Sequence, residues 1–411
     1  MASNAKNLAE YLNNETTSAT ADIANASITA DKLASNAVTT AKIADDAVSS
    51  AKLFAENLGR RNILINGAIQ IHQRGTSLSM AHDGVTSGHI ADRFRMSLGG
   101  SHEQLDGSMI ISNDHPLSNA LSNSIKWTTG TAESSYDSDE YVYIAQIVEA
   151  KNVQHLNWGT SNAKAVTVSF YVKSSITGTY ALGIYKVDST TRIINKTYTI
   201  SSANTWEKKT ITFPADTGGG GINNDNGQGF YLSWHLAAGS GAVGGGSNGA
   251  WKNYSGLSDW ADGQGTSAVM TTGGATWLMT QCQLEVGDTA TDFEHLSVGE
   301  ELQHCYRYYQ KSYGINVAPG TSVNTPHQQK IHGQGYHFFN PTYPVRMRAV
   351  PTLTTYSNGS SGASGKMYNS STSSDIEESA VSYEHGHLVH NASSVSAGHN
   401  IGYHYTAEAE L

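Results

Sequence analysis

Residues 166–175 read VTVSFYVKSS and carry the clearest structural pattern in the chain. Val or Phe stands at every second position, with Thr, Ser, Tyr or Lys between them, which is the period of a strand with one buried face. We expect residues 176–187, ITGTYALGIYKV, to form its partner strand, and residues 206–213, WEKKTITF, to form another. Short strands of this kind, separated by Gly-rich turns, predict a β-sandwich.

Residues 277–287, WLMTQCQLEVG, predict the last strand of this sandwich. Because side chains alternate along a strand, a regular strand places on one face Leu278, Thr280, Cys282 and Leu284. Cys282 is then a core residue. We also expect Cys305 to be a buried thiol, since two cysteines in a reducing compartment imply no disulfide framework.

Length and composition exclude several classes of function. The chain has 411 residues, a net charge of −10 and 15% charged residues, which allows about two or three folded domains. Lys and Arg form no dense cluster, so we expect no nucleic-acid partner. The N-terminus has no apolar core of signal-peptide length, and eighteen consecutive apolar residues occur nowhere, so we expect a chain made in the cytosol without membrane insertion.

A repeat of five residues runs through the N-terminal region. The series consists of Ile23, Ile28, Leu33, Val38, Ile43, Val48, Leu53 and Leu58, with small or polar residues between them. A step of five rotates a helical position by about 140°, so the apolar side chains follow no single helix face. A strand fails as well, because an odd step alternates between its two faces.

So little apolar surface cannot offset the ordering entropy of a single chain. Three copies wound about one axis would place these eight side chains at a shared centre, so we expect a homotrimeric stalk. The alternative is a soluble low-complexity linker.

The repeat ITADKLASNAVTTAKIADDAVSSAKL resembles the stalk repeats of bacteriophage tail-fibre and virion appendage proteins. Residues 61–78, 91–96, 166–181, 205–217 and 277–296 resemble the carbohydrate-binding-module-like β-sandwich that follows the stalk in such fibres. The resemblance implies a mainly β fold, in which a trimeric fibrous stalk precedes a jelly-roll-like sandwich, a short linker helix and a smaller C-terminal β domain. The N-terminus would bind other virion proteins.

The expected domain boundaries follow from these patterns. They are an N-terminal virion-docking segment at 1–20, the stalk at 21–62, the sandwich at 63–297, the linker helix at 298–313 and the C-terminal β knob at 314–411. Ser297 and Glu300 fit a capping box at the start of the helix. The helix would carry one apolar stripe with Leu302, Cys305, Tyr306 and Tyr309.

Aromatic residues in a Gly-rich loop are candidates for binding sugars. The rings of Trp251, Tyr254 and Trp260 would stack on the apolar face of a pyranose. Three neighbouring polar side chains would bind its hydroxyl groups. These are Asn253, Asp259 and Asp262. The alternative is that the rings pack against the edge of the sandwich or a neighbouring subunit.

Two histidines suggest a metal site at the trimer axis. His385 and His387 stand two apart in a segment that we expect to be a strand, so they would point the same way. Three chains would then bring six imidazoles together around a transition-metal ion. The alternative is a set of exposed surface histidines. No other cofactor is expected.

The expected function is therefore that of a structural fibre protein of a bacteriophage virion. It would bind a polysaccharide or another receptor on the host surface, and assemble in the host cytoplasm. Alternatives are a capsid-attached head fibre or decoration protein and a polysaccharide depolymerase. No catalytic motif is present, and the acidic run SSYDSDEY fits a solvated loop, so we expect no enzymatic activity.

Overall fold

The computed structural model describes residues 60–116, 123–323, 327–330, 334–359 and 361–411. Arg60–Leu411 forms one compact unit that is mainly β, as predicted. The predicted docking segment and nearly all of the stalk, including its eight apolar positions, lie outside the described residues. The trimer therefore stays a prediction. No helix in the described part of the chain is both long and apolar enough to cross a membrane.

The first sheet of the sandwich has six antiparallel strands in the order β1-β4-β5-β13-β7-β10. These are β1 (Ser77–Ala81), β4 (Asp106–Ser112), β5 (Ser124–Thr129), β13 (Thr276–Val286), β7 (Val166–Ser174) and β10 (Glu207–Phe213).

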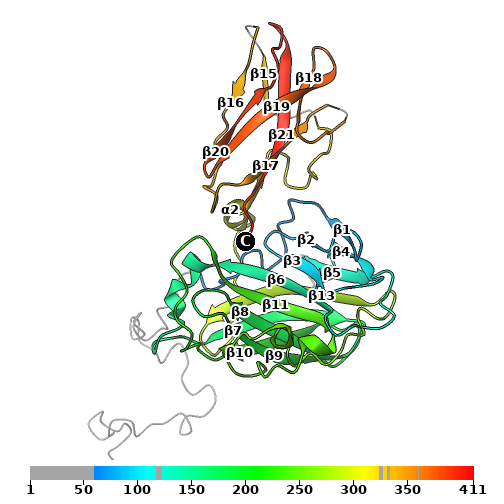
Figure 1. The fold of residues 1–411 in the computed structure, drawn as a ribbon, viewed down its shortest axis with the longest axis vertical. Coiled ribbons are helices and arrows are strands. Elements are labelled where there is room, and N and C mark those ends of the chain that lie inside the picture. Colours follow the sequence, from blue (N-terminus) through cyan, green and yellow to red (C-terminus); the bar gives the residue numbers. More distant parts are fainter. Residues whose placement is uncertain (1–59, 117–122, 324–326, 331–333, 360) are drawn as a thin grey trace, which may run out of the picture. The chain divides into compact units, whose positions relative to one another are not determined.

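The second sheet has seven antiparallel strands in the order β12-β9-β8-β11-β6-β3-β2. These are β12 (Lys252–Asn253), β9 (Arg192–Ile200), β8 (Gly178–Lys186), β11 (Gln228–Ala238), β6 (Tyr141–Glu149), β3 (Arg95–Gly99) and β2 (Ser87–His89). Figure 1 labels all of them except β12. Short 3-10 helices lie at Ala150–Leu156, Ser240–Ala242 and Leu257–Asp259.

The two sheets enclose one hydrophobic core. The apolar face of β7 lies in it as predicted, and Phe170 packs edge-to-face on Trp234 of the opposite sheet with ring centroids 5.8 Å apart. Ile211 and Phe213 of β10 are also core residues. At roughly 1.5–3 kcal/mol for each large apolar side chain buried, this core holds the sandwich together.

The predicted pairing of residues 176–187 with 166–175 is wrong. Strand β7 pairs with β10 and β13, whereas β8 pairs with β9 and β11 in the other sheet. The chain crosses from the six-stranded to the seven-stranded sheet at this connection. The apolar faces of β7 and β8 therefore meet across the core, and the two strands do not lie next to each other in one sheet.

The predicted core face of β13 is wrong before its middle, at Leu278 and Thr280, and right after it, at Cys282 and Leu284. Trp277 and Met279 point into the core before Gln281, and Cys282 and Leu284 point into it afterwards. Gln281 has φ 51°, and the register against β7 shifts by one residue between Thr280 and Gln283. This β-bulge inserts one residue and so reverses the alternation. Cys282 and Cys305 are free and buried, as predicted.

Helix α2 (Val298–Tyr306) begins at the predicted capping box, since the Ser297 hydroxyl accepts from the Glu300 amide and the Glu300 carboxylate accepts from the Ser297 amide. Leu302 and Cys305 pack in a small cluster with Ile65, Ile71 and Tyr308.

The helix is shorter than the predicted 298–313. Tyr309 lies in strand β14 (Tyr309–Lys311), which pairs with the C-terminal strand, so it does not extend the helical stripe. Its ring packs against the Arg74 guanidinium at 3.8 Å. Pairing with β21 and the contact with Arg74 thus replace the backbone hydrogen bonds and side-chain packing that a further helical turn would have given Tyr309.

A third sheet contains eight strands, with the path β14-β21-β18-β19-β20-β16. They are β21 (Asn400–Glu408), β18 (Lys366–Asn369), β19 (Ser374–Tyr383), β20 (Gly386–Asn391) and β16 (Phe338–Phe339), while β15 (His327–Lys330) and β17 (Thr352–Ser357) also pair with β21. As the sequence predicts, the C-terminal segment is held in a sheet. Glu410 then forms buried ion pairs with Arg74 and Arg93 of the sandwich.

Candidate functional site

Aromatic side chains gather on the outer face of the seven-stranded sheet. They line a cleft of about 220 Å³, which we call the aromatic cleft and which consists of Tyr141, Tyr143, Tyr185, Tyr231, Tyr254, Leu257 and Trp260. Tyr141 and Tyr143 come from β6, Tyr185 comes from β8 and Tyr231 comes from β11. The other three residues come from the loop between β12 and β13. The cleft therefore joins a rigid sheet to one long loop.

Strand alternation places the sheet's tyrosines outside the core. In β6, Val142 and Ile144 are buried in the core, so Tyr141 and Tyr143 point to the other face. Tyr231 of β11 lies directly opposite Tyr185 of β8 in the strand register. Three neighbouring strands thus present their rings on one surface.

Trp260 is the centre of the ring cluster. Its indole packs edge-to-face on Tyr143 and Tyr185, with centroids at 5.4 and 5.2 Å, and lies 6.0 Å from Tyr141. Tyr254 packs edge-to-face on Tyr185 at 5.0 Å. Such aromatic pairs contribute about 0.5–1.5 kcal/mol each beyond area burial, which fixes the rings in place.

Buried polar contacts order the loop that carries Tyr254 and Trp260. The Asp259 carboxylate, which is fully buried, forms an ion pair with Lys252 at 2.7 Å and accepts from the amide and hydroxyl of Ser255. Asp262 accepts from the Gly244 and Asn248 amides. Burial alone would raise the pKa of Asp259, but the hydrogen bonds from Lys252 and Ser255 outweigh it and lower that pKa.

The predicted sugar-binding residues fall into two groups. Tyr254 and Trp260 lie in the aromatic cleft. Trp251 does not, because its ring packs edge-to-face on Trp158 at 5.2 Å and its indole N–H donates to the Pro214 carbonyl. This is the packing alternative that the sequence left open for Trp251.

The three predicted polar residues also lie outside the cleft lining. Asn253 is exposed, and its side-chain oxygen accepts from Arg192 at 2.8 Å. Asp259 and Asp262 are buried and serve the loop's own hydrogen bonds. We therefore assign Asp259 and Asp262 an ordering role, and sugar contact remains a prediction for the rings and for Asn253.

Five cleft residues, Leu257 and four tyrosines, were not predicted from the sequence. Tyr141 and Tyr143 form the pattern YVYI, in which aromatic residues occupy the positions that a half-buried strand normally gives to polar ones. Tyr185 and Tyr231 have the same property in their own strands. Aromatic residues on the polar face of several strands are the signal that could have identified the site.

Burial shifts the ionisation of groups in and under the cleft. Desolvation raises the pKa of the Tyr141, Tyr185, Tyr231 and Tyr254 hydroxyls. His235, which packs edge-to-face under Trp260 at 6.0 Å, is fully buried, and desolvation lowers its pKa to about 3. The cleft and its floor are therefore uncharged at neutral pH.

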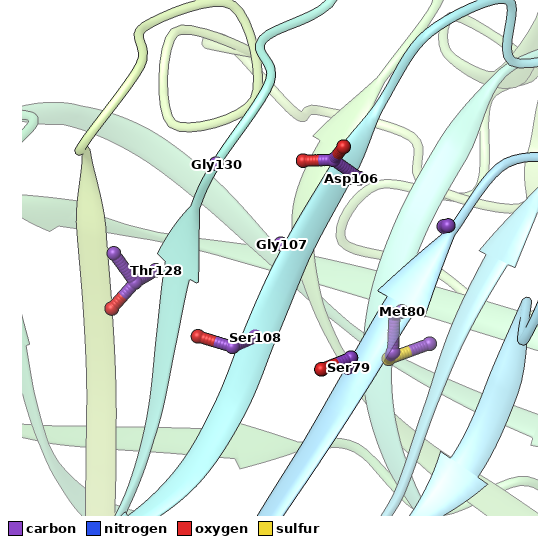
Figure 2. Close-up of a pocket in the computed structure, with 8 residues that line it drawn as sticks. Ser79, Met80, Asp106, Gly107, Ser108, Thr128 and Gly130 are labelled. Carbon is purple, nitrogen blue, oxygen red and sulfur yellow. The ribbon is translucent and has the colours of Figure 1, made fainter.

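The outer face of the six-stranded sheet has a different hollow of about 420 Å³ (Figure 2). Ser79, Ser108 and Thr128 stand opposite one another on β1, β4 and β5, so hydroxyl groups form a row across the strands. Asp106 is the one ionisable residue in its lining, and its carboxylate accepts from the Thr131 amide at 2.6 Å. The hollow contains no aromatic ring.

The predicted metal pair does not form. His385 is exposed in the turn between β19 and β20, where it stacks on Tyr383. His387 is fully buried, and its ring nitrogens lie 3.2 and 3.0 Å from the Tyr343 and Tyr403 hydroxyls. Because the turn separates them and His387 is inside the domain, they cannot point together towards an axis between subunits. The alternative of exposed histidines is also wrong for His387.

No protein-family model matches the sequence, and no curated protein matches it. Among solved structures, the chain is similar to the enzymatically active domain of tailspike protein 4 from bacteriophage CBA120, with 10% identity over 55% of this chain and 21% of that one and a TM-score of 0.29. This chain thus matches about a fifth of that domain.

Two smaller proteins give similar values. A putative sugar-binding protein from Bacteroides thetaiotaomicron is 10% identical over 55% of this chain and 100% of its own, with a TM-score of 0.29. A xylan-binding domain from Paenibacillus barcinonensis is 11% identical over 53% of this chain and 99% of its own, with a TM-score of 0.24.

Proposed function

We propose that this chain is a glycan-binding protein of a bacteriophage virion and that the aromatic cleft binds a polysaccharide of the host surface. The observation that carries the proposal is a cleft of six aromatic rings, of which four are tyrosines from three neighbouring strands and two, Tyr254 and Trp260, come from the loop. Flat aromatic faces stack on the apolar faces of sugar rings, and phenolic hydroxyls can bind sugar hydroxyls. An uncharged cleft suits a neutral stretch of polysaccharide.

The fibre part of the proposal rests on the sequence. The five-residue apolar repeat resembles the stalks of virion appendages and has no solution as a single chain. A homotrimeric stalk would present three clefts at once. Three linked weak sites raise the overall avidity well above the affinity of one site, as a receptor-binding fibre requires.

The test is binding of the full-length chain to an array of bacterial capsular and lipopolysaccharide glycans, followed by calorimetry with the best-binding glycan. Trp260→Ala should weaken binding by about 1–3 kcal/mol, roughly 5- to 150-fold. Trp251→Ala is the matched control, because it removes an equally large ring that packs outside the cleft. Equal effects of the two substitutions would contradict a site in the cleft.

Two further measurements separate the parts of the proposal. Light scattering on the full-length chain should give three times the chain mass of 43.8 kDa, and a mass of one chain would remove the trimer while leaving the cleft untouched. Incubation with the bound polysaccharide should release no reducing ends. Release that survives Trp260→Ala would favour the depolymerase alternative.

A further inference from the structure

Three ionisable side chains meet at one end of the sandwich, in loops that the aromatic cleft does not use. His102 follows β3, Glu133 follows β5, and Glu140 immediately precedes β6. One ligand-type atom from each of the three lies within 4.8 Å of the other two. Because β3 and β6 belong to one sheet and β5 to the other, this cluster joins the two layers of the sandwich.

The cluster is buried. The side chains of His102 and Glu140 are 2% and 1% exposed, and Glu133 is also buried. No lysine or arginine in the described part of the chain forms an ion pair with either glutamate. Two carboxylates enclosed together without a cation carry a large desolvation and repulsion cost, so the site needs either a bound cation or a proton shared between the two carboxylates.

Several polar atoms of the cluster have no hydrogen-bond partner. They are Nδ1 and Nε2 of His102 and Oε1 of Glu140. The Gly99 and Tyr141 carbonyls lie beside the imidazole, but neither ring nitrogen bonds to them with normal geometry. The hydroxyl of Tyr136, whose ring packs edge-to-face on His102 at 5.7 Å, is buried and unpartnered as well.

The remaining carboxylate oxygens are held by the backbone. Glu133 accepts from the Glu103 and Gln104 amides, and Oε2 of Glu140 accepts from the Asp137 amide. These bonds fix both carboxylates and leave Oε1 of Glu140 facing the imidazole. Outer-shell contacts of this kind orient metal ligands in known sites.

The separation of two of the ligand atoms fits a small ion. Nδ1 of His102 lies 3.5 Å from Oε1 of Glu140. Two ligand atoms that each lie about 2.1 Å from a tetrahedral Zn²⁺ are about 3.4 Å apart. Ca²⁺ and Mg²⁺ prefer oxygen ligands, so the imidazole favours a first-row transition metal.

We propose that His102, Glu133 and Glu140 bind one divalent transition-metal ion, with Zn²⁺ as the best fit. The ion supplies the positive charge that the two carboxylates lack, and it fastens the loop before β4 to the loop before β6. Since Glu140 directly precedes Tyr141, the ion also anchors the strand that carries two rings of the cleft. The role is structural, because the buried ligands leave no access for a polysaccharide.

The test uses untagged full-length chain, stripped with chelator and then dialysed against Zn²⁺ or Co²⁺. We expect one ion per chain by elemental analysis, visible Co²⁺ absorption bands of a low-coordinate site, and a thermal unfolding midpoint that rises with Zn²⁺ concentration and falls with EDTA. Glu140→Gln and His102→Gln should each lower Zn²⁺ affinity at least tenfold.

Two control variants distinguish this site from adventitious binding in a chain with seventeen histidines. Asp139→Asn removes a half-buried carboxylate next to the cluster, and His385→Ala removes an exposed imidazole, and both should retain the ion. The proposal is overturned if the wild-type chain retains less than about 0.1 ion per chain with an unchanged midpoint. It is also overturned if Glu140→Gln raises the midpoint equally with and without Zn²⁺, since a shared proton would then be the neutralising partner.

Discussion

The two outer faces of the sandwich occupy equivalent positions and present opposite chemistry. The seven-stranded sheet carries rows of Tyr side chains with Trp260 folded over them, whereas the six-stranded sheet carries a cross-strand row of hydroxyls at Ser79, Ser108 and Thr128. The hollow on the six-stranded sheet is the larger of the two. Ring surface, and not the volume of the hollow, therefore identifies the face suited to sugar.

The faces also differ in what builds them. The hollow is lined by residues of three strands and by Gly130 just after β5, while the aromatic cleft depends on a loop that is held by a buried carboxylate. Substitutions in the loop can alter the two rings that it contributes without disturbing the sheet. The cost is that the site fails if the loop is released.

The largest expected effect comes from releasing that loop. Asp259→Ala leaves Lys252 and the Ser255 amide without their buried acceptor, and it should lower the free energy of unfolding by about 2–3 kcal/mol, allowing for the partial exposure of Lys252. Asp106→Ala in the hollow removes one hydrogen-bond acceptor and should cost about 1 kcal/mol. Urea unfolding followed by Trp fluorescence measures the loss of unfolding free energy in both variants. Equal losses would contradict the conclusion that the aromatic cleft depends on its buried loop carboxylate.

The next effect is a pH dependence that belongs to the aromatic face. His235 has a pKa near 3 in the folded chain against 6.5 for the free side chain, so the unfolded chain binds a proton first as the pH falls. Stability is therefore complete above about pH 6.5 and is lost below it, by about 2 kcal/mol at pH 5 for this residue. His89 of β2 has the same shift and the same sign.

Thermal unfolding of the wild-type chain and of His235→Gln between pH 7 and 5 tests this prediction. The variant should lose less stability over the interval, although His89 keeps part of the slope. The residues that line the hollow include no histidine and contribute nothing to it. A slope that is unchanged in His235→Gln would show that the imidazole is not held neutral beneath Trp260.

The sequence predicts the strands better than it predicts the site. The alternation of β7, the capping box at Ser297 and the C-terminal strand are local patterns, and each is confirmed. The aromatic cleft combines rings from residues 141 to 260, whose meeting depends on the order of strands in the sheet. The sequence pairs β7 with residues 176–187, which in fact form β8 in the other sheet. It therefore gives no indication that β6, β8 and β11 are neighbours that share one surface.

The β-bulge in β13 shows why a local pattern fails. The Asn62 side chain donates to the Cys282 carbonyl and accepts from the Leu284 amide, so it occupies the gap that the inserted residue leaves. The Cys282 amide also donates to the Gly67 carbonyl. These partners are more than two hundred residues away in sequence, and no periodicity within β13 can reveal them.

The histidine pair fails for a similar reason. The spacing of His385 and His387 predicts a shared direction only if both residues lie in one strand. The turn at His385 and the hydrogen bonds of His387 to two tyrosines follow from the pairing of β19 with β20 and of β20 with its neighbours. Conversely, His102, Glu133 and Glu140 have no motif spacing, and only the fold brings them together.

A smaller effect separates ring stacking from hydrogen bonding within the cleft. Tyr185→Ala removes the ring that contacts Tyr231, Tyr254 and Trp260, and it should weaken glycan binding by about 1–2 kcal/mol. Tyr185→Phe keeps the ring and should cost less than about 0.5 kcal/mol. Calorimetry with the best-binding glycan of the array provides the values. If the Phe variant loses as much as the Ala variant, hydroxyl contacts dominate and the two outer faces differ less than their rings suggest.

The smallest expected effect is that of alkaline pH on binding. Desolvation raises the pKa of four cleft tyrosines above the ordinary value of 10.0, so all four stay neutral at pH 9. A phenolate would bring a charge into the cleft and alter its contacts with a neutral sugar, but none forms in this range. The dissociation constant of the glycan should therefore change by less than about twofold between pH 6 and 9.

Calorimetry at both pH values measures this dissociation constant, with tyrosinate absorbance followed in parallel and Tyr254→Phe as the control. A loss of affinity with a midpoint below pH 9 that disappears in Tyr254→Phe would show that this hydroxyl ionises more readily than its burial predicts, and the description of the aromatic face as an uncharged surface would then be wrong.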